Sequence, residues 1–227
     1  MPSLTQSGRD LAALIDHTLL KPEATRAEIE QLCREADEYG FASVCVHPFR
    51  VALAASLLKK SKVCTVIGFP LGANRAEVKA LESIRAVADG AVELDMVMNL
   101  GAFKEGNLAA VENEIASVVK AAKGSVVKVI LETCMLSLEE IATASAVCEI
   151  AGADFVKTST GFGKAGATVE AVAAMHAAVG GRLGIKASGG IRDLKTAQAM
   201  ITAGATRLGT SQGIALVSGG EAAKDKY

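Results

Sequence analysis

The sequence predicts an α/β protein that forms a single (β/α)8 TIM barrel, with a short N-terminal helix, over residues 1–227. Three observations support this prediction. Short runs of β-branched residues alternate with alanine-rich helical patterns along the chain. Eight such pairs fit 227 residues as a compact barrel of parallel strands joined by right-handed crossovers. No linker or low-complexity segment divides the chain, and its length suits one large core.

The strand predictions rest on short β-branched segments, of which the first is weak. For that reason an open, doubly wound sheet remains the alternative to the closed barrel. The strands are expected at His17–Leu20, Ser43–His47, Val63–Gly68, Val92–Met98, Val126–Leu131, Asp154–Thr158, Leu183–Ala187 and Thr206–Gly209.

The helix predictions rest on capping residues at both ends. Thr25, with Glu28 three residues later, has the pattern of a capping box, and each other long helix begins at a capping residue type. These helices are expected at Thr25–Glu38, Asn74–Ala88, Asn107–Ala122, Ser137–Ile150, Thr168–Ala178 and Asp193–Ala203. Left-handed caps are expected at the glycines that follow them, Gly40, Gly90, Gly124, Gly152, Gly180 and Gly204. A short helix over residues 211–217 precedes a tail, residues 219–227, that is expected to be flexible.

The composition excludes several classes of protein. The chain carries 24 Lys and Arg against 25 Asp and Glu, so its net charge is −1. A chain this close to neutral is a poor match for a protein that binds nucleic acid or an anionic membrane. Half of the residues are hydrophobic, which excludes intrinsic disorder. The longest stretch without a charged residue, 208–220, is shorter than the roughly 18 apolar residues of a membrane span.

The cysteines and histidines favour a cytoplasmic protein without a metal. The five cysteines are odd in number, scattered and free of Cys-x-x-Cys spacing, which is typical of reduced thiols. Asp10 and Asp16 interrupt the apolar N-terminal stretch, so it does not resemble a secretory signal. His17, His47 and His176 lack the spacing of a zinc site, and no nucleotide-binding or serine-hydrolase motif is present. We therefore expect no metal and no cofactor.

Charged residues inside the predicted strands are the main functional signal. Strands covered on both faces should be almost wholly apolar, because burying an unpaired charge costs several kcal/mol. Glu93 and Asp95 nevertheless share one strand, and Lys128, Lys157 and Lys186 lie in the strands that follow. Either ion pairing or catalysis explains them. For Lys128 and Glu93 the first explanation is favoured, as a buried supporting ion pair.

Strand alternation predicts which of these side chains meet. Asp95 points to the opposite side from Leu94 and Met96, and the apolar set belongs against the outer helices, so Asp95 is expected inside the barrel. Lys157 and Lys186 lie on neighbouring strands, near the carboxyl ends where barrel active sites form. Two ammonium groups so close repel each other, which favours one neutral amine near pH 7. A neutral amine is what Schiff-base chemistry requires, whereas an isolated strand-end lysine usually only extends to solvent.

Glycine-rich turns after the last two strands predict a phosphate site. Ser188-Gly189-Gly190 follows the seventh strand, and Gly209-Thr210-Ser211 follows the eighth and opens a short helix. Barrels often bind phosphate with these two loops and that helix N-terminus. Outside a barrel, such turns are as often simply turns. Lys164, in a flexible loop beside Lys157, is either a further phosphate ligand or a solvated lysine.

Seven segments together resemble the deoxyribose-phosphate aldolase family, in order along nearly the whole chain. They are IDHTLLKPEAT (15–25), SVCVHP (43–48), VIGFPLGAN (66–74), ELDMVMNLG (93–101), KVILET (128–133), DFVKTSTGF (154–162) and IKASGGIR (185–192). The resemblance implies a metal-free class I aldolase on a (β/α)8 barrel. Such enzymes interconvert 2-deoxy-D-ribose 5-phosphate with D-glyceraldehyde 3-phosphate and acetaldehyde, in deoxynucleoside catabolism.

The resemblance also implies roles for individual residues. Lys157 matches the Schiff-base lysine, Lys186 the neighbouring cation that tunes it, and Asp95 the proton donor and acceptor. The residues that match positions lining or binding the substrate are Asp16, Thr18, Cys45, Thr158, Ser188, Gly189, Gly190, Gly209, Thr210 and Ser211. The implied partner is a small phosphosugar, and the family is commonly dimeric or higher, so a homo-oligomer is expected.

One departure, one further similarity and three alternatives accompany the resemblance. Some family members carry a second lysine directly after TSTG, where this chain has Phe162, with Lys164 two residues later. Many family chains end in tyrosine, as Tyr227 does here, and such a tail could reach the site. The alternatives are another Schiff-base aldolase or transaldolase, a phosphosugar isomerase or synthase that needs no imine, and a barrel that only binds a sugar phosphate.

Overall fold

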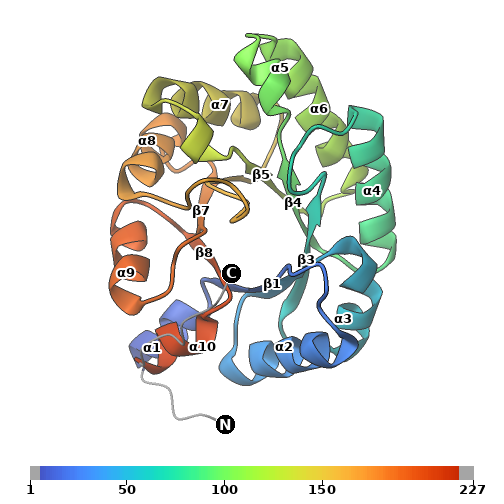
Figure 1. Cartoon of the computed structure of the whole chain (residues 1–227), viewed down its shortest axis with the longest axis vertical. Coiled ribbons are helices and arrows are strands. Elements are labelled where there is room, and N and C mark those ends of the chain that lie inside the picture. Colours follow the sequence, from blue (N-terminus) through green and yellow to red (C-terminus); the bar gives the residue numbers. More distant parts are fainter. Residues whose placement is uncertain (1–5, 220–227) are drawn as a thin grey trace.

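The computed structural model describes residues 6–219 and shows a closed barrel of eight parallel strands surrounded by helices (Figure 1). Each strand pairs with the next, and the first pairs with the last, with Asp16 opposite Gly209 and His17 opposite Thr210. This pairing closes the sheet, so the predicted barrel is confirmed and the open sheet is wrong. The strands are β1 Ile15–Leu19, β2 Ser43–Val46, β3 Lys62–Ile67, β4 Glu93–Val97, β5 Val126–Ile130, β6 Phe155–Lys157, β7 Gly184–Ser188 and β8 Arg207–Thr210.

The helices lie outside the strands, as the alternating pattern predicts (Figure 1). They are α1 Gln6–Ala12, α2 Arg26–Tyr39, α3 Val51–Leu57, α4 Ala76–Ala88, α5 Leu100–Lys104, α6 Leu108–Ala121, α7 Leu138–Ile150, α8 Val169–Val179, α9 Leu194–Thr202 and α10 Gly213–Ser218. α1 is the expected short N-terminal helix. The sequence patterns missed α3, α5 and two 3-10 turns, Pro48–Arg50 and Thr133–Met135, all of which are short.

Most of the predicted caps are present. Thr25 and Ser137 form capping boxes with Glu28 and Glu140, and Asn107, Thr168 and Asp193 also accept a backbone N–H at the start of their helices. All six glycines expected after helices have positive φ, although only Gly40 and Gly180 occupy the cap position itself. The cap expected at Asn74 is wrong. α4 begins after Arg75, and no side chain caps it.

Because side chains alternate along each strand, the outer face of the barrel sheet and its inner face carry different residues. Outward-facing strand residues, among them Leu94, Met96 and Met98, join the helices in one continuous apolar core. The inside of the barrel instead holds charged side chains, including Asp95 and Lys128, which are completely buried. Because burying an unpaired charge is costly, the inner layer is stable only if these charges pair.

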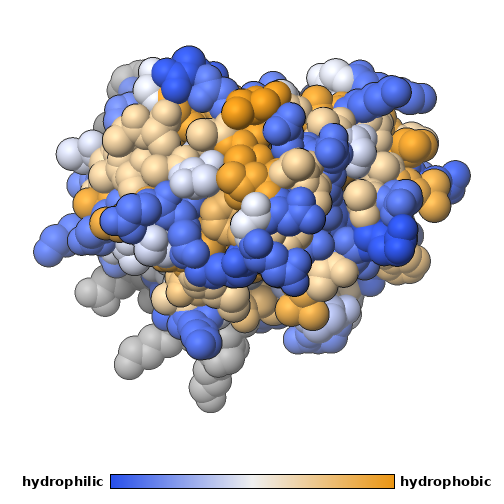
Figure 2. Space-filling model, turned by 90° about the horizontal axis from the view of Figure 1, so that it is seen from above, coloured by the Kyte–Doolittle hydropathy of each residue, from blue (hydrophilic) through white to orange (hydrophobic). Residues whose placement is uncertain are grey.

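Charged and polar side chains surround smaller apolar patches on the side of the molecule shown in Figure 2. Within residues 6–219, no helix has the length and hydrophobicity needed to cross a membrane. The tail expected at 219–227, Tyr227 included, lies outside the described residues apart from Gly219, which ends α10 in a left-handed conformation.

Candidate active site

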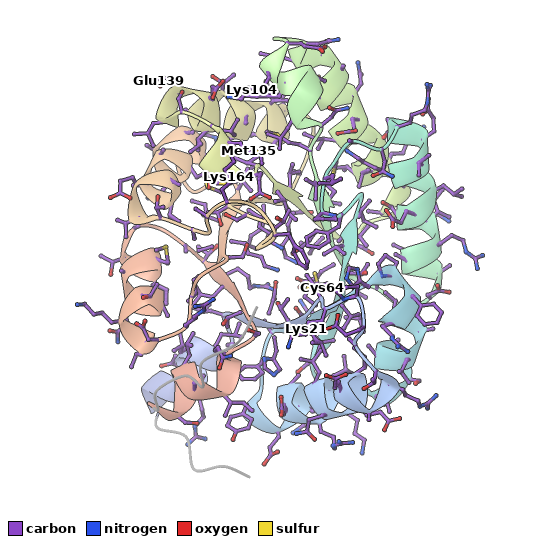
Figure 3. The ribbon with its side chains drawn as sticks, viewed as in Figure 1. Lys21, Cys64, Lys104, Met135, Glu139 and Lys164 are labelled. Atoms are coloured by element: carbon purple, nitrogen blue, oxygen red, sulfur yellow. The ribbon has the colours of Figure 1, made fainter. Side chains whose placement is uncertain are left out.

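Asp95, on β4, is the centre of the buried charge network. Its Oδ2 atom accepts hydrogen bonds from Lys157 Nζ at 2.7 Å and from Lys186 Nζ at 2.6 Å. Its Oδ1 atom accepts one from Lys128 Nζ at 2.8 Å. The Cys64 thiol on β3 donates to the same Oδ1 atom at 3.1 Å, and Figure 3 labels this side chain near the middle of the barrel. One carboxylate therefore serves three lysines from three different strands.

The strand register explains why these side chains meet. Asp95 is opposite Lys128 in the β4–β5 pair, and Lys157 is opposite Lys186 in the β6–β7 pair. Lys157 and Lys186 both bond one oxygen, so their two nitrogens lie no farther apart than the sum of those two bonds. The predicted proximity of the two lysines and the inward direction of Asp95 are both confirmed.

A second layer of charges holds Lys186 and Lys128. Asp16 accepts from Lys186 Nζ at 2.5 Å and from Arg207 Nη1 at 2.6 Å. Glu93 Oε2 is 2.7 Å from Lys128 Nζ, which confirms the predicted ion pair, and 2.9 Å from Arg207 Nη1. Asp16 thus acts as a counter-ion beneath the site, a place that the sequence alone does not reveal.

Cationic side chains outnumber carboxylates in this network. The carboxylates of Asp16, Glu93 and Asp95 face Lys128, Lys157, Lys186 and Arg207. Burial alone would raise the pKa of Asp95, but the three lysines hold that pKa well below its usual range. Burial also opposes the charge of Lys186, yet Asp16 and Asp95 raise the pKa of Lys186 above its usual range. At neutral pH, Asp95 is ionised and Lys186 is protonated.

A cavity of about 170 Å³ opens above this network at the carboxyl ends of the strands. Of the network residues, Lys157 lines it, and the Lys157 side chain is only 4% exposed. The other walls come from the carboxyl ends of β1, β7 and β8 and from the segments that follow β1, β6, β7 and β8. They are Thr18, Leu20, Thr160, Gly161, Phe162, Ser188, Gly189, Gly190, Ile191, Arg192, Gly209, Thr210 and Ser211.

Every residue of the two predicted phosphate turns lines this cavity. Gly189 and Gly190 have φ values of +85° and +79°, which side-chain-bearing residues rarely adopt. A Cβ on Gly209 would lie 3.0 Å from Lys186 Cε, so this glycine also makes room for the lysine. α10 begins at Gly213, two residues later than the helix start predicted at Ser211.

The remaining predicted residues are in the cavity wall, buried away from it, or exposed on a loop. Thr18 lines the cavity, whereas Cys45 and Asp16 are fully buried below it. Thr158 is also buried and is paired with the seventh strand: its hydroxyl donates to Ser188 O and accepts from Ser188 N, both at 3.0 Å. Lys164 is exposed on the loop between β6 and α8 (Figure 3) and is not among the cavity residues.

Sequence patterns did not indicate Arg192 as a cavity residue. Arg192 follows the Ser188-Gly189-Gly190 turn after one intervening residue and is exposed, so it brings a positive charge to the cavity wall. Its position two residues after Gly190 was the available signal. Phe162, noted only as a departure from the family pattern, also lines the cavity and packs edge-to-face on Phe69 at 5.3 Å.

The potential metal ligands in the barrel are already engaged with ammonium groups. Cys45, Cys64 and Asp95 have ligand atoms within 4.8 Å of one another, as do Asp16, Cys64 and Glu93. The carboxylates of both sets bind lysines at hydrogen-bonding distance, and a metal ion would have to displace these lysines. The expectation of a metal-free site stays a prediction.

A model of the DeoC/LacD family aldolases matches residues 11–219. The chain belongs to the DeoC/LacD aldolase family. This family assignment spans the whole barrel, from α1 to the end of α10, and covers every residue of the charge network and of the cavity.

Relatives of this DeoC/LacD aldolase are similar over almost their full length. A deoxyribose-phosphate aldolase from Exiguobacterium sibiricum is 60% identical over 219 residues, which cover 95% of this chain and 99% of the relative. Among solved structures, "QR15, an Aldolase" has a TM-score of 0.90 at 48% identity, covering 92% of this chain and 95% of its own. A tetrameric deoxyribose phosphate aldolase from Aeropyrum pernix has a TM-score of 0.88 at 39% identity, covering 94% and 92%.

Proposed function

We propose that the chain is a Schiff-base aldolase that reversibly cleaves 2-deoxy-D-ribose 5-phosphate to D-glyceraldehyde 3-phosphate and acetaldehyde, in deoxyribose phosphate catabolism. The family assignment and the name of the relatives support this substrate. One observation carries the proposal. Lys157 lines the cavity while its Nζ atom shares an Asp95 oxygen with the buried Lys186.

Lys157 is the nucleophile in this proposal. Lys186 and Lys128 stay charged because carboxylates surround them, so neither has the free lone pair that a nucleophile needs. A neutral amine facing the cavity can attack a carbonyl carbon.

The turns after β7 and β8 bind the phosphate in this proposal. Gly189 and Gly190 have no side chains, so an anion can approach their backbone N–H groups closely. Ser188, Thr210 and Ser211 line the same cavity, and Arg192 adds a positive charge. Anchoring the phosphate holds the other end of the sugar beside Lys157, so binding energy orients the reacting carbonyl.

The bond changes follow from this placement. The Lys157 amine adds to C1 of the open-chain sugar, and loss of water gives an iminium that withdraws electrons from the C2–C3 bond. Asp95, directly or through a water, accepts the C3 hydroxyl proton as that bond breaks and glyceraldehyde 3-phosphate leaves. The electron pair of the broken bond forms an enamine. Protonation of its C2 carbon and addition of water release acetaldehyde and regenerate the amine.

Product identification tests this function. The purified enzyme, supplied with 2-deoxyribose 5-phosphate, is expected to release acetaldehyde and glyceraldehyde 3-phosphate in equal amounts. A Schiff-base aldolase for another phosphosugar would instead cleave other members of a substrate panel faster. An isomerase or synthase would leave the carbon chain intact, and a binding protein would return the sugar unchanged.

Assembly and location complete the proposal. The Aeropyrum pernix relative is described as tetrameric, which supports a homo-oligomer here, to be measured by light scattering. All five cysteines are free thiols, which supports a reducing, cytoplasmic location.

A further inference from the structure

Glu132 combines a buried carboxylate with a backbone conformation that glutamate rarely adopts. Its φ and ψ are 55° and 61°, in the left-handed region. Lys123 is the other non-glycine residue with positive φ among residues 6–219, and it is exposed in a turn after α6. Glu132 is 4% exposed and lies two residues after the end of β5. Strained residues that persist inside a fold are concentrated at functional sites.

The left-handed residue is the extra residue of a β-bulge beside Lys157. Leu131 N donates to Lys157 O and Thr133 N donates to Thr158 O, both at 2.9 Å. Between these two bonds the chain after β5 advances two residues while the chain at the end of β6 advances one, so Glu132 has no counterpart there. A bulge changes the direction of a side chain at the point where pairing ends. Here it directs the carboxylate to the loop that follows β6.

That carboxylate contacts the loop directly at Thr160 and Gly163 and reaches Phe162 through the Thr160 hydroxyl. Thr160 donates to it twice, from Oγ1 to Oε2 at 2.5 Å and from N to Oε1 at 3.3 Å. The Thr160 hydroxyl oxygen in turn accepts from Phe162 N at 3.0 Å. A Cβ on Gly163 would lie 3.0 Å from Glu132 Cδ, so the loop packs directly on the carboxyl group.

The held loop is one wall of the cavity and touches the phosphate turn. Thr160, Gly161 and Phe162 all line the cavity, whereas Glu132 is not among its lining residues. Gly161 Cα is 3.6 Å from the position that a Cβ on Gly189 would occupy. A shift of the loop would therefore displace the backbone that faces the phosphate.

We propose that Glu132 is a positioning residue that fixes the loop Thr160–Gly163 in the shape that receives the phosphate end of the substrate. The proposal rests on the proposed function for its substrate. Glu132 takes no part in the imine chemistry, because its carboxylate contacts the loop and the Cys134 thiol rather than the lysines of the charge network. The bulge and its strain keep the carboxylate under Thr160 rather than in the barrel interior.

Three variants separate positioning from simple stability. Glu132→Gln replaces one acceptor oxygen with an N–H₂ group, which cannot accept from Thr160. Glu132→Gly removes the carboxylate that binds Thr160 and also relieves the backbone strain, so the backbone change itself should not lower Tm. Thr160→Ser keeps the hydroxyl. Glu139→Gln, the same change at an exposed position on α7, is the matched control.

The measurements are KM and kcat with 2-deoxyribose 5-phosphate, calorimetric binding of inorganic phosphate, and borohydride trapping with acetaldehyde. For Glu132→Gln and Glu132→Gly we expect KM and the phosphate Kd to rise about tenfold, the equivalent of one lost charge-assisted hydrogen bond. Trapping by acetaldehyde, which has no phosphate, should stay at the wild-type rate. Glu139→Gln should match the wild type, and Thr160→Ser, which keeps the donor hydroxyl, should raise KM and the phosphate Kd less than either Glu132 variant.

Unchanged KM and phosphate binding in both Glu132 variants would overturn the proposal, as would an equal loss of trapping and phosphate binding. A fall in Tm without a change in KM would assign Glu132 a structural role only. Failure of the proposed function has a different signature: the wild type would resist trapping, while phosphate binding would still depend on Glu132.

Discussion

Removing the charge of Lys186 should move the pH dependence of the enzyme in a defined direction. The Lys186→Leu variant keeps the volume of the side chain but leaves Lys157 without its cationic neighbour. A positive charge beside the reacting amine disfavours protonation near it, so the loss of that charge should move the acid limb of the pH–rate profile to higher pH. The loss of Lys186 also leaves more of the Asp95 charge facing Lys157, which acts in the same direction.

The size of the shift follows from the shared oxygen. Lys157 Nζ and Lys186 Nζ lie 2.7 Å and 2.6 Å from the same Asp95 atom. At about 5 Å and an effective dielectric constant of about 20, two unit charges repel each other by roughly 3 kcal/mol. This energy corresponds to a shift of roughly two pH units in the acid limb of the rate profile.

The assay is kcat/KM for 2-deoxyribose 5-phosphate from pH 5 to pH 10, because its acid limb reports the free enzyme. Lys186→Arg keeps a positive charge and should keep the acid limb near its wild-type position. Lys120→Leu, at an exposed site on α6, controls for the loss of one charge from the whole protein. An acid limb that does not move in Lys186→Leu, while the protein remains folded, would refute the electrostatic role of Lys186.

Three further predictions concern the loops, the fold and the metal. Gly189→Ala should raise KM for 2-deoxyribose 5-phosphate more than KM for 2-deoxyribose. The φ of Gly189 is +85°, and the new Cβ would lie 2.8 Å from Gly166 Cα, so the backbone of the turn must shift. Equal effects on both sugars would contradict a phosphate site. Asp37 accepts hydrogen bonds from the backbone N–H groups of Lys59, Lys60 and Ser61. Burial raises the pKa of Asp37, but these hydrogen bonds outweigh burial and lower it. The contribution of Asp37 to stability is therefore present above about pH 4 and is lost as pH falls. Asp37→Asn should therefore lower the free energy of unfolding on the order of 1–2 kcal/mol at pH 7 and have less effect at pH 3, as urea titrations can measure; a loss independent of pH would assign the effect to packing. Prolonged treatment with a chelator should leave the rate of cleavage unchanged, and strong inhibition reversed by zinc would indicate a metal enzyme.

The eight alternating strand and helix patterns predicted the barrel, and side-chain alternation along a strand predicted the inward direction of Asp95. It works because a period of two assigns each side chain to the core or to the interior. The proximity of Lys157 and Lys186 followed from consecutive parallel strands. The helix cap expected at Asn74 was wrong because residue type alone does not determine where the backbone turns helical, and α4 begins one residue after Arg75.

Sequence patterns could not predict the contacts between side chains across the barrel. Asp16 and Lys186 are 170 residues apart, and their contact depends on the register that closes β8 onto β1. Asp95 as the shared partner of three lysines likewise depends on the three-dimensional register. The bulge at Glu132 had no signal, because left-handed positions are expected at glycine and asparagine rather than glutamate.

The central claim is that Lys157 is the amine that reacts, and trapping tests it most directly. The enzyme is incubated with acetaldehyde and borohydride, and the modified peptide is identified by mass spectrometry. We predict a reduced ethyl adduct on Lys157, absent from Lys157→Ala, while Lys186 and Lys128 remain unmodified. An adduct on Lys186 in the wild type, or no adduct under conditions that trap a known Schiff-base aldolase, would contradict it.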